Sequence, residues 1–309
     1  MSMFNSSRFS SPMAGIAMVL LASVAVSSKA IIVKLAYVYP VDPATLIALR
    51  MAFSVPFFAA LAWWSARQDS LATLSLRQWM AVLGLGAIGG YGPMWLDFAG
   101  LAYVSAGLER IILFLYPTMV LMFSALMFRQ AIGRRELFAV VTGYAGVGLV
   151  VGHDIEFVHG TADVVFMGAT LVFASAVLYA AYLVLSGKLI PQVGASRFTA
   201  YTMLVATFTS GMHYAGSQHV VSWSQLPDEV YLLSLLMAVV ATVLPAVLLN
   251  IGIQRLGSNR ASLISSIGPV STIFLAWIFL GEHITWLQLG GTALVMAGVL
   301  AVSLGRKST

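Results

Sequence analysis

The second half of this chain repeats the proline and glycine spacing of the first half at a constant offset of 152 residues. Four matched features keep this offset without a gap: Pro93 with Pro245, Gly100 with Gly252, Pro117 with Pro269, and Ala145-Gly146 with Ala297-Gly298. Because proline and glycine restrict or free the backbone, a shared spacing of both indicates two copies of one backbone path. We therefore expect two similar halves, residues 1–152 and residues 153–309.

Both halves are too apolar for a protein that folds in water. Hydrophobic residues make up 60% of the chain and charged residues only 9%, against about a quarter charged in soluble domains. A helix of about 20 apolar residues crosses the hydrocarbon core of a bilayer. Ten such spans are predicted, at 14–36, 43–65, 78–100, 106–128, 135–152, 163–186, 196–215, 230–253, 259–280 and 286–304. For 196–215, which is rich in Thr and Ser, a half-buried segment is the alternative.

Five predicted spans in each half place the second copy upside down relative to the first. The predicted fold class is therefore an all-α integral membrane protein, with ten transmembrane helices arranged as two inverted five-helix repeats. Inverted repeats around a site at the midplane are an architecture of secondary transporters. The loops are too short to hold a soluble domain, and the absence of cysteine excludes disulfides and thiolate metal sites.

The distribution of Lys and Arg predicts the orientation. Clear flanking cations of one membrane face are Arg8, Arg67, Arg77, Arg129, Arg134, Arg135, Lys188, Arg197, Arg255, Arg260, Arg306 and Lys307, whereas the other face has only Lys34. The positive-inside rule then puts both termini in the cytoplasm of a bacterial-type inner (plasma) membrane. Because these cations are dispersed over short loops, they do not indicate nucleic-acid binding.

Five ionisable residues lie three or more residues inside the ends of the predicted spans, and a charge at a helix centre costs at least about 2.5 kcal/mol. They are Lys29, Arg50, Asp97, Glu109 and Arg110. Lys29 and Arg50 lie close to the midplane and are candidates for one substrate-binding cavity. Asp97, Glu109 and Arg110 lie nearer the outer surface and are candidates for proton coupling or an outer gate. The five charges leave one net positive charge, which would suit a substrate carboxylate.

Each of these residues also has a structural interpretation. Arg50 could clamp the carbonyl groups of a helix end, and Lys29 could extend its side chain to the membrane surface. Asp97 could form a surface ion pair with the neighbouring Glu109-Arg110 segment, a contact of little energetic value. The sequence alone does not decide between these interpretations and a role in transport.

Five aromatic residues within the spans are further candidates for substrate binding. A small-molecule site combines an apolar wall with a few polar groups, and tyrosine supplies both. The candidates are Tyr91, Trp95, Tyr116, Tyr179 and Tyr182. Packing or a position in the interfacial aromatic belt is the alternative for each of them.

The repeated prolines are predicted hinges. A proline inside a helix removes one backbone hydrogen bond and allows a bend, so Pro93 and Pro245 could act as paired hinges, while Pro117 and Pro269 would kink the neighbouring spans. Because membrane helices also tolerate proline for packing reasons, a purely structural role remains open.

The chain carries no motif of a soluble or ATP-driven enzyme. It lacks the phosphate-binding loop, the zinc-protease motif and the nucleophile elbow, so we predict no catalytic residues and no cofactor. The histidines His153, His159, His213, His219 and His283 are expected in solvated outer segments, without metal-ligand spacing. Glu282 is expected to cap the connection between the ninth and tenth spans.

Short motifs distributed over the whole chain carry a family resemblance. They are Lys34 at the end of the first span, Ala48-Leu49-Arg50, Ser105-Ala106-Gly107, Tyr116-Pro117, Ile267-Gly268-Pro269, Leu280-Gly281-Glu282 and Ala297-Gly298-Val299. In their order and duplication the chain resembles the EamA-type exporters of the drug/metabolite transporter superfamily. It departs from the usual pattern at Lys29, at Glu109-Arg110 and at Gln130.

The resemblance implies a secondary active transporter, not an enzyme, that exports small metabolites such as amino acids or related carboxylate-bearing compounds by alternating access. Its expected partners are the small-molecule substrate, membrane lipids and protons, and a monomer or homodimer is expected. Two other classes remain open: an intramembrane enzyme acting on a lipid or small hydrophobic substrate, with Asp97 and Glu109 as its carboxylates, and a non-transporting membrane scaffold.

Overall fold

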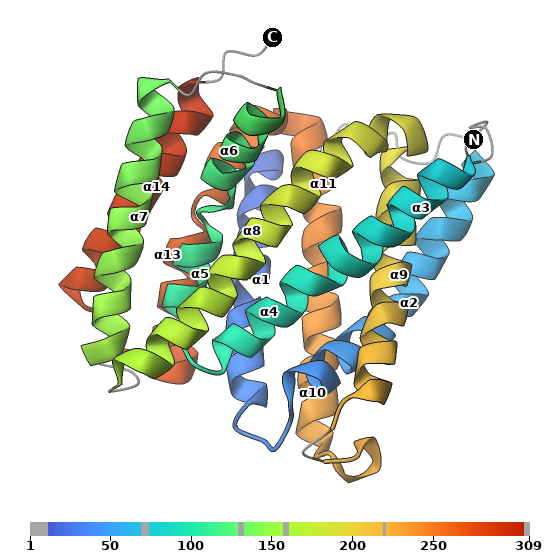
Figure 1. Ribbon diagram of the computed structural model, residues 1–309, viewed down its shortest axis with the longest axis horizontal. Coiled ribbons are helices and arrows are strands. Elements are labelled where there is room, and N and C mark those ends of the chain that lie inside the picture. Colours follow the sequence, from blue (N-terminus) through green and yellow to red (C-terminus); the bar gives the residue numbers. More distant parts are fainter. Residues whose placement is uncertain (1–11, 69–73, 129–132, 157–160, 219–220, 306–309) are drawn as a thin grey trace.

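The computed structural model describes residues 12–68, 74–128, 133–156, 161–218 and 221–305, and within these ranges the secondary structure is helical, without strands. Figure 1 shows a bundle of long, tilted helices. Several residues of the sequence analysis lie outside the described ranges: Arg8, Arg129, Gln130, His159, His219, Arg306 and Lys307.

The first half consists of a series of helices that is interrupted twice, by a π-helical segment and by a short turn. Its elements are α1 (Pro12–Ala36), α2 (Pro43–Gln68), α3 (Leu76–Gly84), the π-helical η1 (Leu85–Tyr91), α4 (Gly92–Leu101), α5 (Ala106–Leu113), α6 (Tyr116–Phe128) and α7 (Arg134–Asp154). The elements α3, η1 and α4 follow one another without a gap, whereas a short turn separates α5 from α6.

The second half repeats this series. Its elements are α8 (Ala162–Val193), α9 (Ala195–Gly216), the short η3 (Trp223–Gln225), α10 (Asp228–Ala238), the π-helical η4 (Val239–Val243), α11 (Leu244–Leu256), α12 (Ser258–Ser265), α13 (Gly268–Leu280) and α14 (Trp286–Gly305). Every α-helix from α2 to α7 begins 152 residues before its counterpart in the series from α9 to α14. The offset read from prolines and glycines is therefore also the offset of the helix starts.

The two halves pack against each other through equivalent pairs of helices. Helix α1 packs against α11 and α13, and its counterpart α8 packs against α4 and α6, which are the counterparts of α11 and α13. The self-equivalent pairs α2 with α9 and α7 with α14 lie at opposite sides of the bundle in Figure 1. The first helix of each half is thus embedded among helices of the other half.

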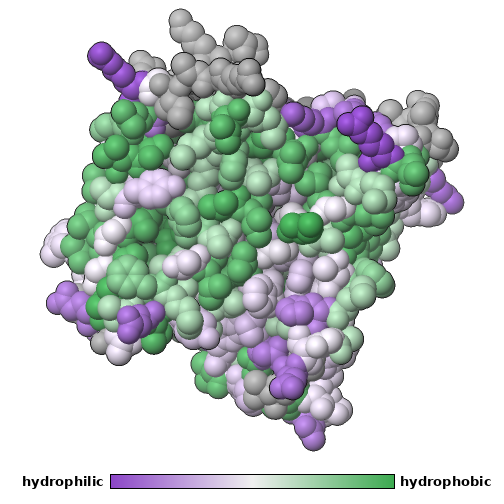
Figure 2. Space-filling model, in the orientation of Figure 1, coloured by the Kyte–Doolittle hydropathy of each residue, from purple (hydrophilic) through white to green (hydrophobic). Residues whose placement is uncertain are grey.

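Seven helical stretches of the described residues are long and apolar enough to cross a membrane. They are Met13–Ala36, Pro43–Arg67, Ala106–Met127, Glu136–Asp154, Ala162–Val193, Asp228–Leu256 and Leu263–Leu280, and Trp286–Ala301 is a shorter apolar helix. Figure 2 shows apolar residues over much of one face, with hydrophilic residues concentrated toward its upper and lower edges. The predicted spans 78–100 and 196–215 are helical but less apolar, because glycines interrupt the first and Thr and Ser residues the second.

Two predicted spans are each divided into two helices, at the prolines that were expected to kink them. The stretch 106–128 is divided between α5 and α6, and 259–280 is divided between α12 and α13. The prolines explain the division, because Pro117 and Pro269 each occupy the second position of the helix after the break. Proline fits the first turn of a helix, where its missing N–H needs no partner.

The other two repeated prolines also stand at the second position of a helix. Pro93 follows η1 at the start of α4, and Pro245 follows η4 at the start of α11. A proline ring clashes with the carbonyl group one turn before it, and a local π-helical turn is one way to relieve such a clash. The sequence therefore located the irregular positions, but their type, a π-helical segment, is a finding of the structure.

Glycines allow the two halves to approach closely. Gly100 on α4 lies against Gly168 on α8, and a Cβ atom added to Gly168 would lie 2.6 Å from Cβ of Tyr103 and 3.0 Å from the carbonyl oxygen of Gly100. Small residues at such contacts are typical of membrane helix pairs. The counterpart of Gly100, Gly252 on α11, meets Val19 of α1 in the same way.

This contact predicts a position-specific effect on stability. Gly168→Ala should destabilise the protein by about 1–3 kcal/mol, the usual cost of overpacking, measured as a lower melting temperature of purified protein in detergent. Gly187→Ala on the same helix is the matched control, because nothing lies within 4 Å of its added Cβ, and it should be neutral or stabilising. Equal melting temperatures of the two variants would contradict the close contact.

Candidate functional site

Three ionisable side chains from three helices meet inside the first half. The Lys29 ammonium on α1 donates a hydrogen bond to Oε1 of Glu109 on α5 at 2.8 Å and another to Oδ2 of Asp97 on α4. The side chain of Glu109 is fully buried, that of Asp97 is 6% exposed and that of Lys29 is 15% exposed. We call these three residues the Lys29 triad.

Local structure brings the two carboxylates together. Helices α4 and α5 are joined by the short turn 102–105, so that Asp97 near the end of α4 and Glu109 in the first turn of α5 face the same neighbour. Ser105 caps α5, because its hydroxyl oxygen accepts a hydrogen bond from the backbone N–H of Leu108 at 3.0 Å. A serine at this position is a strong start signal for a helix.

The Lys29 triad does not satisfy all of its polar atoms. The buried Asp97 Oδ1 and Glu109 Oε2 have no hydrogen-bond partner among the described residues. When all three groups are ionised, they carry one net negative charge. Two carboxylates that share one cation in a buried site repel each other, so the site can accept one further positive charge.

This geometry overturns one interpretation of the sequence. Asp97 and Glu109 are buried in the protein and paired with Lys29, so a surface ion pair formed with Arg110 is excluded.

Arg50 and Lys29 contact different residues. The Nη2 and Nε atoms of Arg50 donate to the hydroxyl oxygen of Thr242 on η4, at 2.9 and 3.2 Å, and its guanidinium lies 5.6 Å from the ring centroid of Phe98. Arg50 thus joins α2 to the π-helical segment of the opposite half. Whether it also contacts a substrate stays a prediction.

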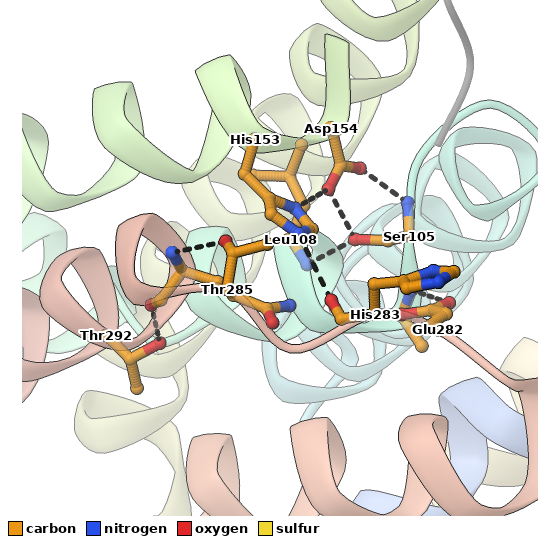
Figure 3. Close-up of polar contacts among 10 residues, drawn as sticks. Ser105, Leu108, His153, Asp154, Glu282, His283, Thr285 and Thr292 are labelled. Carbon is orange, nitrogen blue, oxygen red and sulfur yellow. Dashed lines mark hydrogen bonds and ion pairs between the residues drawn. The ribbon is translucent and has the colours of Figure 1, made fainter. Parts of the chain in front are cut away.

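The N-terminus of α5 is held by acidic side chains from two other elements, as Figure 3 shows. Asp154 at the end of α7 accepts hydrogen bonds from the backbone N–H and the hydroxyl of Ser105, both at 2.7 Å. Glu282, in the turn after α13, accepts one from the backbone N–H of Ala106 at 3.0 Å. Carboxylates are favourable at this end of a helix because its free N–H groups and dipole are positive.

Glu282 and His153 correct two expectations. Glu282 caps α5 instead of the connection in which it lies. Burial raises the pKa of its carboxyl, and the hydrogen bond from the Ala106 N–H partly offsets this effect. His153 is buried, 3.3 Å from Asp154 and 3.2 Å from the carbonyl oxygen of His283, so it is not in a solvated loop.

The predicted aromatic residues form two separate groups. In one, Tyr91 and Trp95 both contact the ring of His213 on α9, and the Tyr91 hydroxyl is hydrogen-bonded to it. His213 therefore lies in a helix within this group and not in a loop. In the other group, the rings of Tyr116 and Tyr179 meet edge to face at 5.4 Å, and Tyr179 stacks on Tyr182 at 6.2 Å.

Arg110 follows Glu109 in sequence but has different neighbours. Its guanidinium lies beside Gly268 at the start of α13, where a Cβ atom added to the glycine would be 2.8 Å from Nη2 of Arg110. Asp154, Thr242 and His213 are polar residues of these contacts that the sequence analysis did not select as site residues. Asp154 is recognisable only in retrospect, as an acidic residue directly after an apolar span.

The site offers ion pairing and proton binding, and nothing in it points to a metal. Among the described residues no group of three His, Asp or Glu side chains could hold a metal ion.

Comparison with known proteins gives matches over both halves. The profile of the EamA-like transporter family matches residues 13–152 and again residues 166–304. An uncharacterized transporter of Bacillus subtilis, YcbK, is 35% identical over 296 residues, covering 93% of this chain and 92% of the relative. A probable amino-acid metabolite efflux pump of Salmonella typhimurium is 24% identical over 226 residues, covering 71% and 74%. One solved crystal structure shares the fold with a TM-score of 0.64 at 18% identity, covering 95% and 98% of the two chains.

The pairing in the Lys29 triad predicts the effect of removing its cation. Lys29→Met leaves two buried carboxylates together, and breaking a buried ion pair costs about 3–5 kcal/mol, so the melting temperature in detergent should fall markedly. The triple variant Lys29→Met, Asp97→Asn, Glu109→Gln should recover most of this loss because no charge remains.

Lys188→Met serves as the control, because this lysine is exposed near the end of α8, and it should melt like the unmodified protein. A Lys29→Met protein that also melts like the unmodified protein would show that the triad contributes no stability.

Proposed function

This chain belongs to the EamA-like transporter family, and from that premise we propose that it is a ten-span, proton-coupled secondary transporter that exports small carboxylate-bearing metabolites by alternating access. The family match and the names of the relatives support a transporter. The Lys29 triad supports coupling to protons, and the interrupted helices support the conformational change of alternating access.

The apolar helices, taken together with the repeat, support ten spans. The seven long apolar stretches and the helix Trp286–Ala301 account for eight. The continuous stretch from α3 to α4 and helix α9 supply the other two, since each is the counterpart of an element that belongs to an apolar stretch, α10 to α11 and α2. Five spans in each half then give inverted repeats, with both termini in the cytoplasm by the positive-inside rule.

The observation that carries the proposal is the pair of buried carboxylates on one ammonium. The Lys29 triad has one negative charge in excess and two carboxylate oxygens without a hydrogen-bond partner among the described residues. A proton bound to Glu109 or Asp97 would neutralise the site and supply a hydrogen-bond donor. Because a net charge is costly inside the membrane, the site would hold one proton and release it when it opens to water.

The conformational change has defined positions at which to occur. The segments η1 and η4 precede Pro93 and Pro245 at equivalent depths, and the breaks before Pro117 and Pro269 are equally paired. Backbone hydrogen bonds are already interrupted at these four positions, so bending there breaks few additional ones. Rotation of α1, which packs on α11 and α13, would move the Lys29 triad relative to the second half.

The substrate class is supported by two independent features. A relative is named a probable amino-acid metabolite efflux pump, and Arg50 and Arg110 are cations within the spans that lie outside the Lys29 triad. Guanidinium groups bind carboxylates in a planar, two-pronged geometry. We therefore propose amino acids and related carboxylic acids as substrates.

If Glu109 and Asp97 bind the transported proton, removing one of these carboxylates should abolish coupling to the pH gradient without abolishing transport. In proteoliposomes loaded with a mixture of the twenty protein amino acids, the Glu109→Gln variant should lose efflux driven by a pH gradient, as followed by mass spectrometry. Exchange at equal concentrations and equal pH should persist, because it does not require the proton. Asp97→Asn should behave in the same way if the two carboxylates share one proton.

Glu229→Gln is the matched control, since Glu229 is an exposed carboxylate in the first turn of α10, and it should leave both activities unchanged. Gradient-driven efflux that survives in both triad variants would assign Asp97 and Glu109 to structure alone.

The orientation predicts which positions are reachable from outside. In this cysteine-free chain, Thr161→Cys before α8 and Ser217→Cys after α9 should react with an impermeant thiol reagent in intact cells. Gln192→Cys near the other end of α8 should react only after the cells are permeabilised. Labelling of Gln192→Cys alone in intact cells would reverse the orientation.

A further inference from the structure

The Nε atom of Arg110 is a buried donor without an acceptor among the described residues. Arginine keeps its charge at any physiological pH. A buried N–H group left unpaired is costly. Glu109, the residue before it, is turned toward Lys29 and does not fill this role.

The surroundings of Arg110 are aromatic and partly open. The guanidinium interacts electrostatically with the hydroxyl groups of Tyr116 and Tyr179. Tyr179 forms the centre of a row of rings with Tyr116 and Tyr182, yet it remains 39% exposed in the middle of α8. The row therefore borders an accessible space instead of being closed by neighbouring side chains.

A second positive feature lies at the same place. Arg110 lies against Gly268, the first residue of the 13-residue helix α13. The residue before this helix, Ile267, provides no side-chain cap. The dipole of a helix start favours anions, so it adds to the positive charge of the Arg110 guanidinium.

We propose that Arg110, together with Tyr116 and Tyr179, recognises the carboxylate of the transported compound, while the row of Tyr179 and Tyr182 holds its flat or apolar part. This assignment rests on the proposed transport function and deepens it by naming the anion-binding end of the site. The guanidinium donates two parallel hydrogen bonds to the carboxylate, and the tyrosine hydroxyls donate further ones.

The Lys29 triad indicates that the substrate does not need an amino group for binding. Asp97 and Glu109, which could bind a substrate ammonium, already contact Lys29, and the one further positive charge that the Lys29 triad can accept is the proton of the proposed function. An amino group on the substrate therefore adds little to binding. Recognition is expected to depend on the carboxylate and the apolar part, so a carboxylic acid without an amine should bind like the amino acid.

Three probes of similar size separate these contributions. L-Phenylalanine carries both groups, 3-phenylpropionate lacks the amine, and phenethylamine lacks the carboxylate. Binding to purified full-length protein is measured by ligand-induced thermal stabilisation, which reports affinity without requiring transport. The two carboxylates should stabilise the protein, and phenethylamine should not.

The variants then assign the carboxylate contact to Arg110. Arg110→Gln should weaken both carboxylate probes by about 10- to 100-fold, the loss expected for charge-assisted hydrogen bonds. Arg197→Gln is the matched control, because Arg197 on α9 also has a buried Nε without a partner among the described residues and lies 6.0 Å from the ring of Tyr201. Its affinity for the probes should be unchanged.

Two further variants keep the test decisive if Arg110→Gln does not fold. Arg110→Lys retains the charge but loses the two-pronged geometry and should bind carboxylates more weakly, and Tyr179→Leu should weaken the aromatic probes while leaving the overall fold intact. Equal affinities of the Arg110 variants and the unmodified protein would overturn the proposal, as would binding of phenethylamine as tight as that of the acids, or no carboxylate binding at all.

The proposed transport function fails under a different observation. If the carboxylates bind through Arg110 but no proteoliposome experiment gives efflux driven by a pH gradient, the binding site stands and proton-coupled export does not. If amines are exported with a pH gradient while carboxylates do not bind, transport stands and the assignment of Arg110 does not.

Discussion

The arrangement of the first half depends on the ion pairs that the ammonium of Lys29 forms with Asp97 and Glu109. This ammonium lies within the apolar stretch Met13–Ala36, where an unpaired charge is costly, and it is stabilised only because α4 and α5 each supply a carboxylate. The same helix packs against α11 and α13 of the second half. Lys29 therefore connects the charge of the site directly to the interface between the two repeats.

Helix α5 concentrates the remaining chemistry in eight residues. Asp154 and Glu282 hold its N-terminus, Glu109 faces the Lys29 triad, and Arg110 faces α13 and the tyrosines. Binding of a proton at Glu109 and of an anion at Arg110 would act on neighbouring residues of this one element, which is a direct physical basis for coupling them.

The sequence predicted the architecture well because duplication copies the residues that set the backbone. The 152-residue offset of the prolines coincides with the offset of the helix starts from α2 to α7, and membrane helices form wherever the chain is apolar for long enough. Hydropathy carries no information on interruptions within such a stretch. Pro117 and Pro269 predicted kinks there, but the complete breaks before Tyr116 and Gly268 are findings of the structure. The contact between Lys29 and Glu109, 80 residues apart in sequence, depends on tertiary packing that no local pattern encodes.

The two halves share a backbone but not a site. Leu249 and Ala261 occupy the positions equivalent to Asp97 and Glu109, and Tyr182 lies near the position equivalent to Lys29. The interruptions are present twice, whereas the Lys29 triad is present once, so the proton of the proposed function would bind residues of one repeat. Two inverted repeats of equal energy would have no preference between inward and outward states. A charge difference confined to one of them would make the balance of the two states depend on the proton, and a pH gradient would act on the conformational change in this way.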